Sequence, residues 1–267
     1  MNMNDVVGRD DIVLITFDTL RYDVAQSAWE AGRLPNLAKL LPPSGWERRH
    51  SPGNFTFAAH AAFFTGFLPT PASPGRHPRR FALRFPGSET TDEETCVLDG
   101  ETIVAGLAAR GYHTVCVGGV GFFNQLTPLG SLLPGFFAES HWSPELGVTD
   151  PDSTQNQIQV ACQSIARLAS DERLFLFINL SALHQPNCGY LPGRVEDDCD
   201  TQRAALEYVD SQLPPLWETL QRRGGGFGIL CADHGTAYGE DGYWGHRLSH
   251  PVVWEVPYAE IAWKQKS

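Results

Sequence analysis

Long hydrophobic runs are missing from this chain of 267 residues. No apolar stretch approaches the ~20 residues that a membrane-spanning helix needs, so the sequence predicts no contact with a membrane. The opening stretch "MNMNDVVGRDDIVLITF" has acids ahead of a short apolar run and no cleavage site, which is unlike a secretory signal peptide. We therefore expect a cytoplasmic protein.

Positive charge is scarce, with 20 Lys and Arg residues against 31 Asp and Glu residues and a formal net charge of −11. A protein that binds nucleic acid without regard to sequence needs a basic surface, so the composition argues against nucleic acid as a partner. The acidic runs at 91–95 and 196–200 are typical of solvated loops. A protein this acidic must supply positive charge locally to bind an anion, through a metal ion or a helix N-terminus.

Paired cysteine motifs are absent as well, since the 6 cysteines are scattered and none forms a C-x-x-C pair. In a chain of this length they are most simply reduced thiols, with a secreted disulfide framework as the alternative. The sequence has no internal repeat and no clear linker. We expect a single domain over residues 1–267, which is long enough to bury a core without staples.

Apolar runs alternate with helical patterns along the chain. The runs that favour buried strands are 11–17, 113–119, 174–181, 227–232 and 259–264. Helical spacing occupies 35–41, 101–112, 152–169 and 200–224, the last interrupted near Pro214 and Pro215. This alternation predicts an α/β fold with a mostly parallel sheet covered on both faces. The Gly-, Pro- and Ser-rich segments 70–98 and 121–151 predict long surface excursions.

Polar residues stand at the ends of three different strand runs. They are Asp18, His184 and the pair Asp233 and His234. In an open parallel sheet, ligands bind beyond the carboxyl ends of the strands. Each residue alone has a structural explanation as a turn or loop residue. Their shared placement predicts that they meet at one edge as ligands of a divalent metal.

The stretch "GNFTFAAHAAFFTGFLPT", residues 53–70, places Thr56 just ahead of a helical pattern that contains His60. One interpretation makes Thr56 only the N-cap of that helix. A second makes its hydroxyl a nucleophile, since a helix N-terminus offers free N–H groups and a positive dipole end to an anionic ester. The two interpretations are compatible at the level of sequence.

Four blocks of the chain occur in an order that carries a family resemblance. They are "FDTLRYD", "TFAAHAAFFTGFLPT", "ALHQPN" and "CADHGTAYGEDGYWGHRLSHPVVWEVPYAE", and they lie within residues 12–260. Together they resemble the alkaline phosphatase superfamily, which includes sulfatases, nucleotide pyrophosphatases/phosphodiesterases and phosphoethanolamine transferases. The resemblance implies a three-layer α/β/α sandwich with a mostly parallel central sheet. It also implies a metal-dependent enzyme that acts on phosphoryl or sulfuryl esters.

The resemblance identifies the nucleophile by its spacing from a Thr-Gly pair. In the superfamily the nucleophile stands nine residues before that threonine, and Thr65-Gly66 places it at Thr56. The pattern Thr-Phe-x-x-His is most similar to the phosphodiesterase branch, and it implies that His60 lies near the site as a catalytic residue.

The same resemblance implies the ligands of one metal ion: Asp18, Asp233, His234 and the Thr56 oxygen. Zinc or manganese suits this mixture of imidazole and carboxylate ligands. A water activated by the metal or a histidine is then expected to release phosphate from the enzyme.

A second metal site is in doubt from the sequence. His184 and His246 are implied either to hold a second ion or to bind phosphoryl oxygens, and one of them to protonate the leaving group. Members with two metals carry an Asp four residues before the middle histidine, where this chain has Leu180. Other donors, including His250 or an acid from 145–152, are the alternative ligands.

The activity expected from these features is hydrolysis of a small-molecule phosphate monoester or diester through a covalent phospho-threonine. Sulfatases use a Cys or Ser converted to formylglycine, and Thr56 has no route to that group. The alternatives are a sulfatase, a transferase of the same superfamily, and a member that binds a ligand without turnover. The sequence leaves the substrate and the oligomeric state open.

Overall fold

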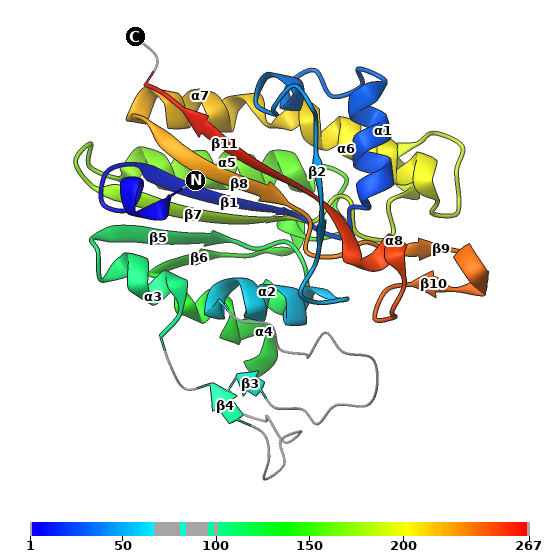
Figure 1. Cartoon of the computed structure of the whole chain (residues 1–267), viewed down its shortest axis with the longest axis horizontal. Coiled ribbons are helices and arrows are strands. Elements are labelled where there is room, and N and C mark those ends of the chain that lie inside the picture. The colour runs from blue at the N-terminus through cyan, green and yellow to red at the C-terminus, as the bar shows by residue number, and fades with distance from the viewer. Residues whose placement is uncertain (1, 67–80, 84–95, 99–100, 266–267) are drawn as a thin grey trace.

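A seven-stranded sheet lies at the centre of the molecule (Figure 1). The computed structural model describes residues 2–66, 81–83, 96–98 and 101–265. The strand order is β2-β11-β8-β1-β7-β5-β6. Neighbouring strands from β8 to β6 are parallel, whereas β11 is antiparallel to both β8 and β2. These observations confirm the mostly parallel sheet expected from the sequence.

The strands of this sheet are β1 (Asp11–Phe17), β2 (Glu47–His50), β5 (Tyr112–Val117), β6 (Glu139–His141), β7 (Arg173–Leu180), β8 (Gly226–Cys231) and β11 (Glu255–Trp263). Two short pairs stand apart from it, β3 (Phe81–Leu83) with β4 (Cys96–Leu98), and β9 (Ala237–Tyr238) with β10 (Trp244–Gly245).

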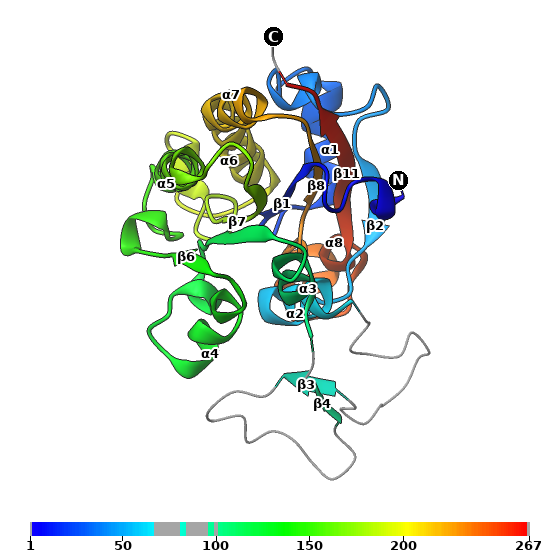
Figure 2. The ribbon, with the colours of Figure 1, turned by 90° about the vertical axis from the view of Figure 1, so that its left-hand side faces the viewer.

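Helices cover both faces of the sheet (Figures 1 and 2). One layer contains α1 (Tyr22–Glu30), α5 (Ser153–Arg167), α6 (Cys199–Gln212) and α7 (Pro214–Arg223). The opposite layer contains α2 (Thr56–Thr65), α3 (Ile103–Ala108) and α4 (Pro128–Leu132), and α8 (Pro251–Trp254) precedes β11. Along β1, Val13 and Ile15 pack into the first layer while Ile12 and Leu14 pack into the second. The central strand is apolar throughout because both of its faces are buried.

Several expected boundaries shift in the structure. The helix expected at 35–41 is a single 3₁₀ turn, Leu37–Lys39, and the one expected at 101–112 is only Ile103–Ala108. The long pattern at 200–224 is two helices, separated at Leu213 just before the two prolines, as the sequence predicts. Strands β2 and β6 were not expected, because both are short and β2 has four exposed polar residues that give no apolar pattern.

The segment 121–151 is a correction to the sequence prediction. It is not a surface excursion but a structured layer containing α4, β6 and three 3₁₀ turns. Phe123, Leu133 and Phe137 are buried and join the core beneath α2 and α3. Three of its prolines begin short helical elements: Pro128 starts α4, and Pro134 and Pro144 start two of the 3₁₀ turns. The other expected excursion, 70–98, lies outside the described residues except for β3 and β4.

The cysteines of the described region give a measurable expectation. Cys116, Cys162, Cys188, Cys199 and Cys231 are free, and burial raises the pKa of the Cys116 and Cys231 thiols. We expect six thiols on titration of the denatured, unreduced protein, and slow reaction of Cys116 and Cys231 in the folded protein because thiolate is the reactive form. Recovery of fewer than six thiols would contradict the prediction of a reducing compartment.

No helix in the described ranges combines the length and apolarity needed to span a membrane.

Candidate active site

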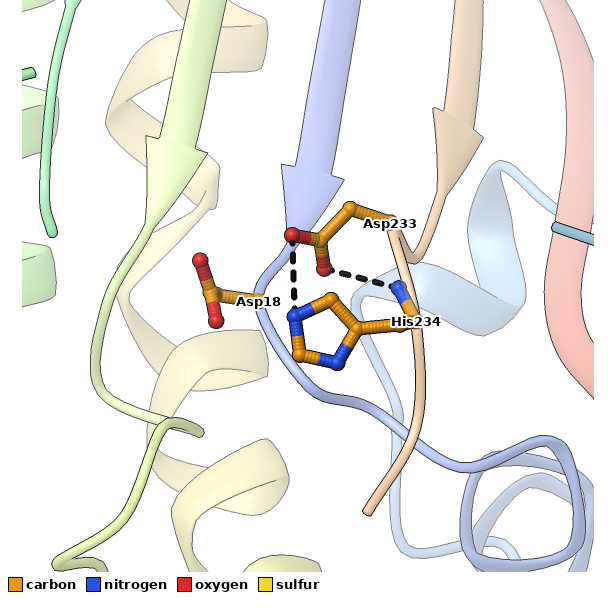
Figure 3. Close-up of side chains that lie close together, drawn as sticks. All are labelled: Asp18, Asp233 and His234. Carbon is orange, nitrogen blue, oxygen red and sulfur yellow. Dashed lines mark hydrogen bonds and ion pairs between the residues drawn. The ribbon is translucent and has the colours of Figure 1, made fainter. Parts of the chain in front are cut away.

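Three adjacent strands deliver the candidate ligands to one end of the sheet. Asp18 follows β1, Asp233 and His234 follow β8, and His184 stands four residues after β7. One ligand atom from each of Asp18, Asp233 and His234 lies within 4.8 Å of the others, and their side chains converge between the strand ends (Figure 3). All three residues are completely buried. The structure therefore brings together the three residues that the sequence predicts as core ligands.

The two buried carboxylates fit a metal ion. Asp18 Oδ1 and Asp233 Oδ2 accept no hydrogen bond from the described residues. Their other oxygens do, Asp18 Oδ2 from Asn179 Nδ2 at 3.0 Å and Asp233 Oδ1 from the backbone N–H of His234 at 2.9 Å. Each carboxylate thus keeps one oxygen for a cation. Burial, with added repulsion from Asp233, raises the pKa of Asp18 to about 6, and burial raises that of Asp233 to about 7.

His234 presents the ring nitrogen that a metal ligand needs. Its Nδ1 lies 2.8 Å from the carbonyl oxygen of Gly235, which can only accept, so Nδ1 carries the proton and Nε2 the lone pair. Burial lowers the pKa of His234, which keeps the ring neutral. A side chain at Gly235 would come within 2.0 Å of the Val252 carbonyl oxygen, so glycine is required for this close approach.

Thr56 adjoins the three-residue cluster, and it does not cap α2. It is the first residue of the helix, the cap position belongs to Phe55, and no side chain bonds to the free N–H groups there. The Thr56 hydroxyl instead lies 3.3 Å from His234 Nε2. The interpretation of Thr56 as an N-cap is therefore wrong. Its hydroxyl stands beside the candidate metal ligands at the positive end of a ten-residue helix.

The other two predicted histidines lie next to this cluster. The ring centroid of His246 is 4.6 Å from that of His234 and 5.7 Å from that of His184. His184 Nδ1 lies 2.5 Å from the carbonyl oxygen of Gln185, which leaves Nε2 as its free ring nitrogen. Burial and the neighbouring histidines lower the pKa of His246 to about 3. Leu180 is buried in the core, so no carboxylate joins these histidines from that position. Their roles stay predictions.

His60 lies on the inner side of α2, away from solvent. The ring is completely buried and makes edge contacts with Phe63, Phe123 and Phe177 at centroid distances of 5.3–5.5 Å. Burial lowers its pKa to about 3, so the ring is neutral. Among the described residues, its ring nitrogens lie at hydrogen-bond distance from Thr16 Oγ1 and the Thr56 carbonyl oxygen, and Nδ1 lies 3.7 Å from Asp233 Oδ2. A catalytic role for His60 stays a prediction.

A cleft of about 520 Å³ opens over Thr56. Its polar lining includes Thr56, His184, His246 and Arg247, and its apolar lining includes Phe122 and the 66% exposed Trp244. Thr56 therefore lies between the buried ligand cluster and a space large enough for a small ester.

No sequence pattern identifies Arg21 or Arg247 as a site residue. Arg21 is buried and pairs with both Asp23 and Glu240, which ties the loop after Asp18 to the β9–β10 hairpin. Arg247 follows His246 on the same hairpin, and its guanidinium lies 5.7 Å from the centre of the Phe55 ring. Only the fold shows that Arg21 holds the loop after Asp18 against the hairpin and that Arg247 lines the cleft, since neither stands at the end of a main-sheet strand.

Comparison with known proteins agrees with this architecture at low sequence identity. No family model and no curated protein sequence matches the chain. The periplasmic domain of phosphoethanolamine transferase EptC from Campylobacter jejuni is 12% identical with a TM-score of 0.63, covering 98% of this chain and 82% of the other. An alkaline phosphatase superfamily protein from Vibrio parahaemolyticus is 18% identical with a TM-score of 0.58, covering 95% and 60%.

A third similar structure is the sulfatase-type protein YidJ from Bacteroides fragilis, 13% identical with a TM-score of 0.61, covering 95% of this chain and 68% of the other. The three proteins share one layered architecture with this chain despite their different names. The chain therefore has an alkaline phosphatase/sulfatase-like fold.

Proposed function

We propose that this chain is a metal-dependent enzyme that cleaves phosphate esters with Thr56 as the nucleophile. The observation that carries the proposal is the position of the Thr56 hydroxyl, 3.3 Å from His234 Nε2, at a helix N-terminus that forms part of a cleft. Asp18, Asp233 and His234 would hold a zinc or manganese ion, since they combine carboxylate and imidazole donors. Such an ion would act as a Lewis acid and lower the pKa of the adjacent hydroxyl.

The residues of the chain supply the remaining steps. Thr56 Oγ1 forms a bond to phosphorus as the bond to the leaving oxygen breaks, which leaves a phosphoryl group on Thr56. The hydroxyl proton of Thr56 passes to His184 Nε2 and from there to the leaving oxygen, so that the first product departs as an alcohol. The N–H groups at the start of α2 stabilise the charge that develops on the phosphoryl oxygens. His184 Nε2 then takes a proton from the water that attacks phosphorus, and it returns this proton to Thr56 Oγ1 as the bond between Oγ1 and phosphorus breaks, which releases phosphate and restores the hydroxyl.

A panel of esters tests this proposal directly. The zinc- or manganese-loaded protein is assayed with phosphomonoester, phosphodiester, phosphonate and sulfate substrates, and its metal content is measured. We expect phosphate esters to be cleaved faster than sulfate esters, because Thr56 cannot form the formylglycine of sulfatases. Preference for sulfate would overturn the substrate class, and no cleavage of any ester would overturn the enzyme assignment.

A transferase is the second candidate, because a phosphoethanolamine transferase shares the fold. The covalent step on Thr56 is then the same, and an alcohol replaces water as the acceptor. Product analysis in the presence of added alcohols separates the two: a transferase forms a new ester, whereas a hydrolase releases only phosphate.

Arg247 supplies positive charge to the cleft. Among the described residues that line this cleft, it is the only Lys or Arg, and none is an Asp or Glu. Within the described part of the chain no carboxylate pairs with its guanidinium. Its charge reaches the site, where it contributes to lowering the pKa values of His234 and His246. We therefore assign it to an anionic oxygen of the bound ester.

Replacing this arginine should weaken substrate binding. For Arg247→Gln we expect KM to rise about tenfold with a smaller change in kcat, since a hydrogen bond to a charged group contributes ~1.5–3 kcal/mol. Arg222→Gln is the matched control: it removes the same charge from α7, where Arg222 is 74% exposed and pairs with Glu218. Equal KM values for the two variants in steady-state kinetics would remove Arg247 from the substrate site.

A further inference from the structure

A chain of buried polar groups connects Asp18 to the main chain of Thr56. Asn179 Nδ2 lies 3.0 Å from Asp18 Oδ2 and 3.3 Å from Thr16 Oγ1. Thr16 Oγ1 lies 3.0 Å from His60 Nε2, and His60 Nδ1 lies 2.7 Å from the Thr56 carbonyl oxygen. The three connecting side chains have no exposed surface. They join the end of β1 to the first turn of α2.

The direction of each hydrogen bond follows from the chemistry of its ends. The Thr56 carbonyl only accepts, so His60 Nδ1 donates to it, and the neutral ring then accepts at Nε2 from the Thr16 hydroxyl. The orientation of the Asn179 amide is settled independently, because its Oδ1 accepts from the backbone N–H of Val120 at 3.2 Å. Its Nδ2 group therefore donates to both Thr16 and Asp18.

Apolar side chains exclude water from this hydrogen-bonded path. Phe63, Phe123 and Phe177 surround the His60 ring, and His60 does not line the cleft. Hydrogen bonds in such an apolar environment are stronger than in water, and a partner that is lost cannot be replaced by solvent. Thr16 Oγ1 also lies 3.5 Å from the Ile178 carbonyl oxygen, but His60 Nε2 is its closer acceptor, so removing the Thr16 hydroxyl leaves His60 Nε2 without a donor among the described residues.

We propose that Thr16 and His60 are positioning residues that hold the candidate metal ligand Asp18 and the candidate nucleophile Thr56 in a fixed relation. This inference rests on the proposed function. It replaces a direct catalytic role for His60, whose ring contacts the Thr56 main chain and Thr16 rather than the cleft. Partners in the outer shell of a metal ligand commonly change metal affinity or activity by about 10–100-fold when they are removed.

The test removes one hydroxyl from the middle of the path. Thr16→Val preserves the branched shape and deletes the bonds to His60 and Asn179. We expect zinc affinity, measured by isothermal titration calorimetry, to fall about tenfold or more. With the best ester, kcat should fall by a similar factor while KM changes little. Thr16→Ser restores the hydroxyl and should restore both quantities.

A matched control is available on β5. Thr114 is also a buried strand threonine, and its hydroxyl accepts from the backbone N–H of Ala138 at 2.9 Å, outside this path. Thr114→Val should leave zinc affinity unchanged even if it lowers the melting temperature. Parental zinc affinity in folded Thr16→Val would overturn the inference, and so would an equal loss in Thr114→Val.

A second variant serves if Thr16→Val does not fold. His60→Phe suits the aromatic surroundings and removes the bond to the Thr56 carbonyl. His60→Phe should lower zinc affinity in the same way. In proton NMR it should abolish the slowly exchanging imidazole N–H resonance expected for His60. A His60→Phe variant that binds zinc like the parent would reject the inference. The measurement of zinc affinity does not depend on whether the protein cleaves an ester. If the protein binds zinc and depends on Thr16 but cleaves no ester, the proposed function fails while the positioning role stands.

Discussion

Thr56→Ala should leave the fold intact and lower turnover of the best phosphate ester at least about a thousandfold, which corresponds to ~4 kcal/mol of barrier. The structure removes the competing explanation, because Thr56 caps no helix and its hydroxyl contacts His234 Nε2 instead. Thr56→Ser keeps the hydroxyl and should retain part of the activity, since the loss of the methyl group only frees the rotamer. Steady-state kinetics with the metal-loaded protein measures both variants.

The control for this experiment lies at the other end of the same helix. Thr65 donates its hydroxyl to the Ala61 carbonyl at 2.7 Å and does not line the cleft. Thr65→Ala should therefore retain parental kcat and KM. A phospho-threonine trapped at Thr56 after an acid quench, found by mass spectrometry, would support the covalent route. The nucleophile assignment is wrong if Thr56→Ala cleaves the ester as fast as the parent.

Metal affinity should depend steeply on pH, because Asp18 and Asp233 must lose their protons to bind a cation. With pKa values of about 6 and about 7 in the metal-free protein, both carboxyls are largely protonated near pH 5 and ionised near pH 8. Zinc affinity should therefore rise about a thousandfold over this range, roughly tenfold from Asp18 and a hundredfold from Asp233. Burial lowers the pKa of His234, so protons compete with zinc for this ring less than they would for an exposed histidine.

Calorimetric titration with zinc at several pH values measures this slope, and buffers of different ionisation enthalpy count the protons released. Asp18→Asn should reduce the slope by one proton. Asp210 provides the control, because it is also a buried carboxylate but has both oxygens occupied by donors from Asn36 and Leu37. Asp210→Asn should not alter the slope. An affinity that is flat from pH 5 to 8 would show that these carboxyls do not bind the ion.

The sequence predicts the central part of this fold well because burial on both faces produces continuous apolar runs. The runs at 11–17 and 174–181 correspond to β1 and β7 within one residue. The same logic locates Asp18 and Asp233, since both stand directly beyond buried strands. Edge strands are harder to predict from sequence. All four residues of β2 are exposed, so β2 lacks the alternation of apolar and polar residues by which a strand is recognised.

Other parts of the site depend on contacts that no sequence pattern records. The motif places His60 near Thr56, but only the fold shows that its ring lies among phenylalanines and bonds to Thr16. Arg247 reaches the cleft because the β9–β10 hairpin folds back beside Phe55. These placements depend on which distant segments pack together. The local preferences of single residues hold no information about such long-range packing.

The position of β1 has a consequence for how the molecule forms. This strand is near the start of the chain, yet its two partners are distant, with Ile12 opposite Phe175 on one side and Phe227 on the other. Pairing over such separations folds slowly, because a long loop must close before any contact is gained. During synthesis the apolar β1 must wait, unpaired, for most of the chain to follow. Asp18 therefore meets Asp233 only after β8 has paired with β1, so metal binding by these two residues would report that the central strands have assembled.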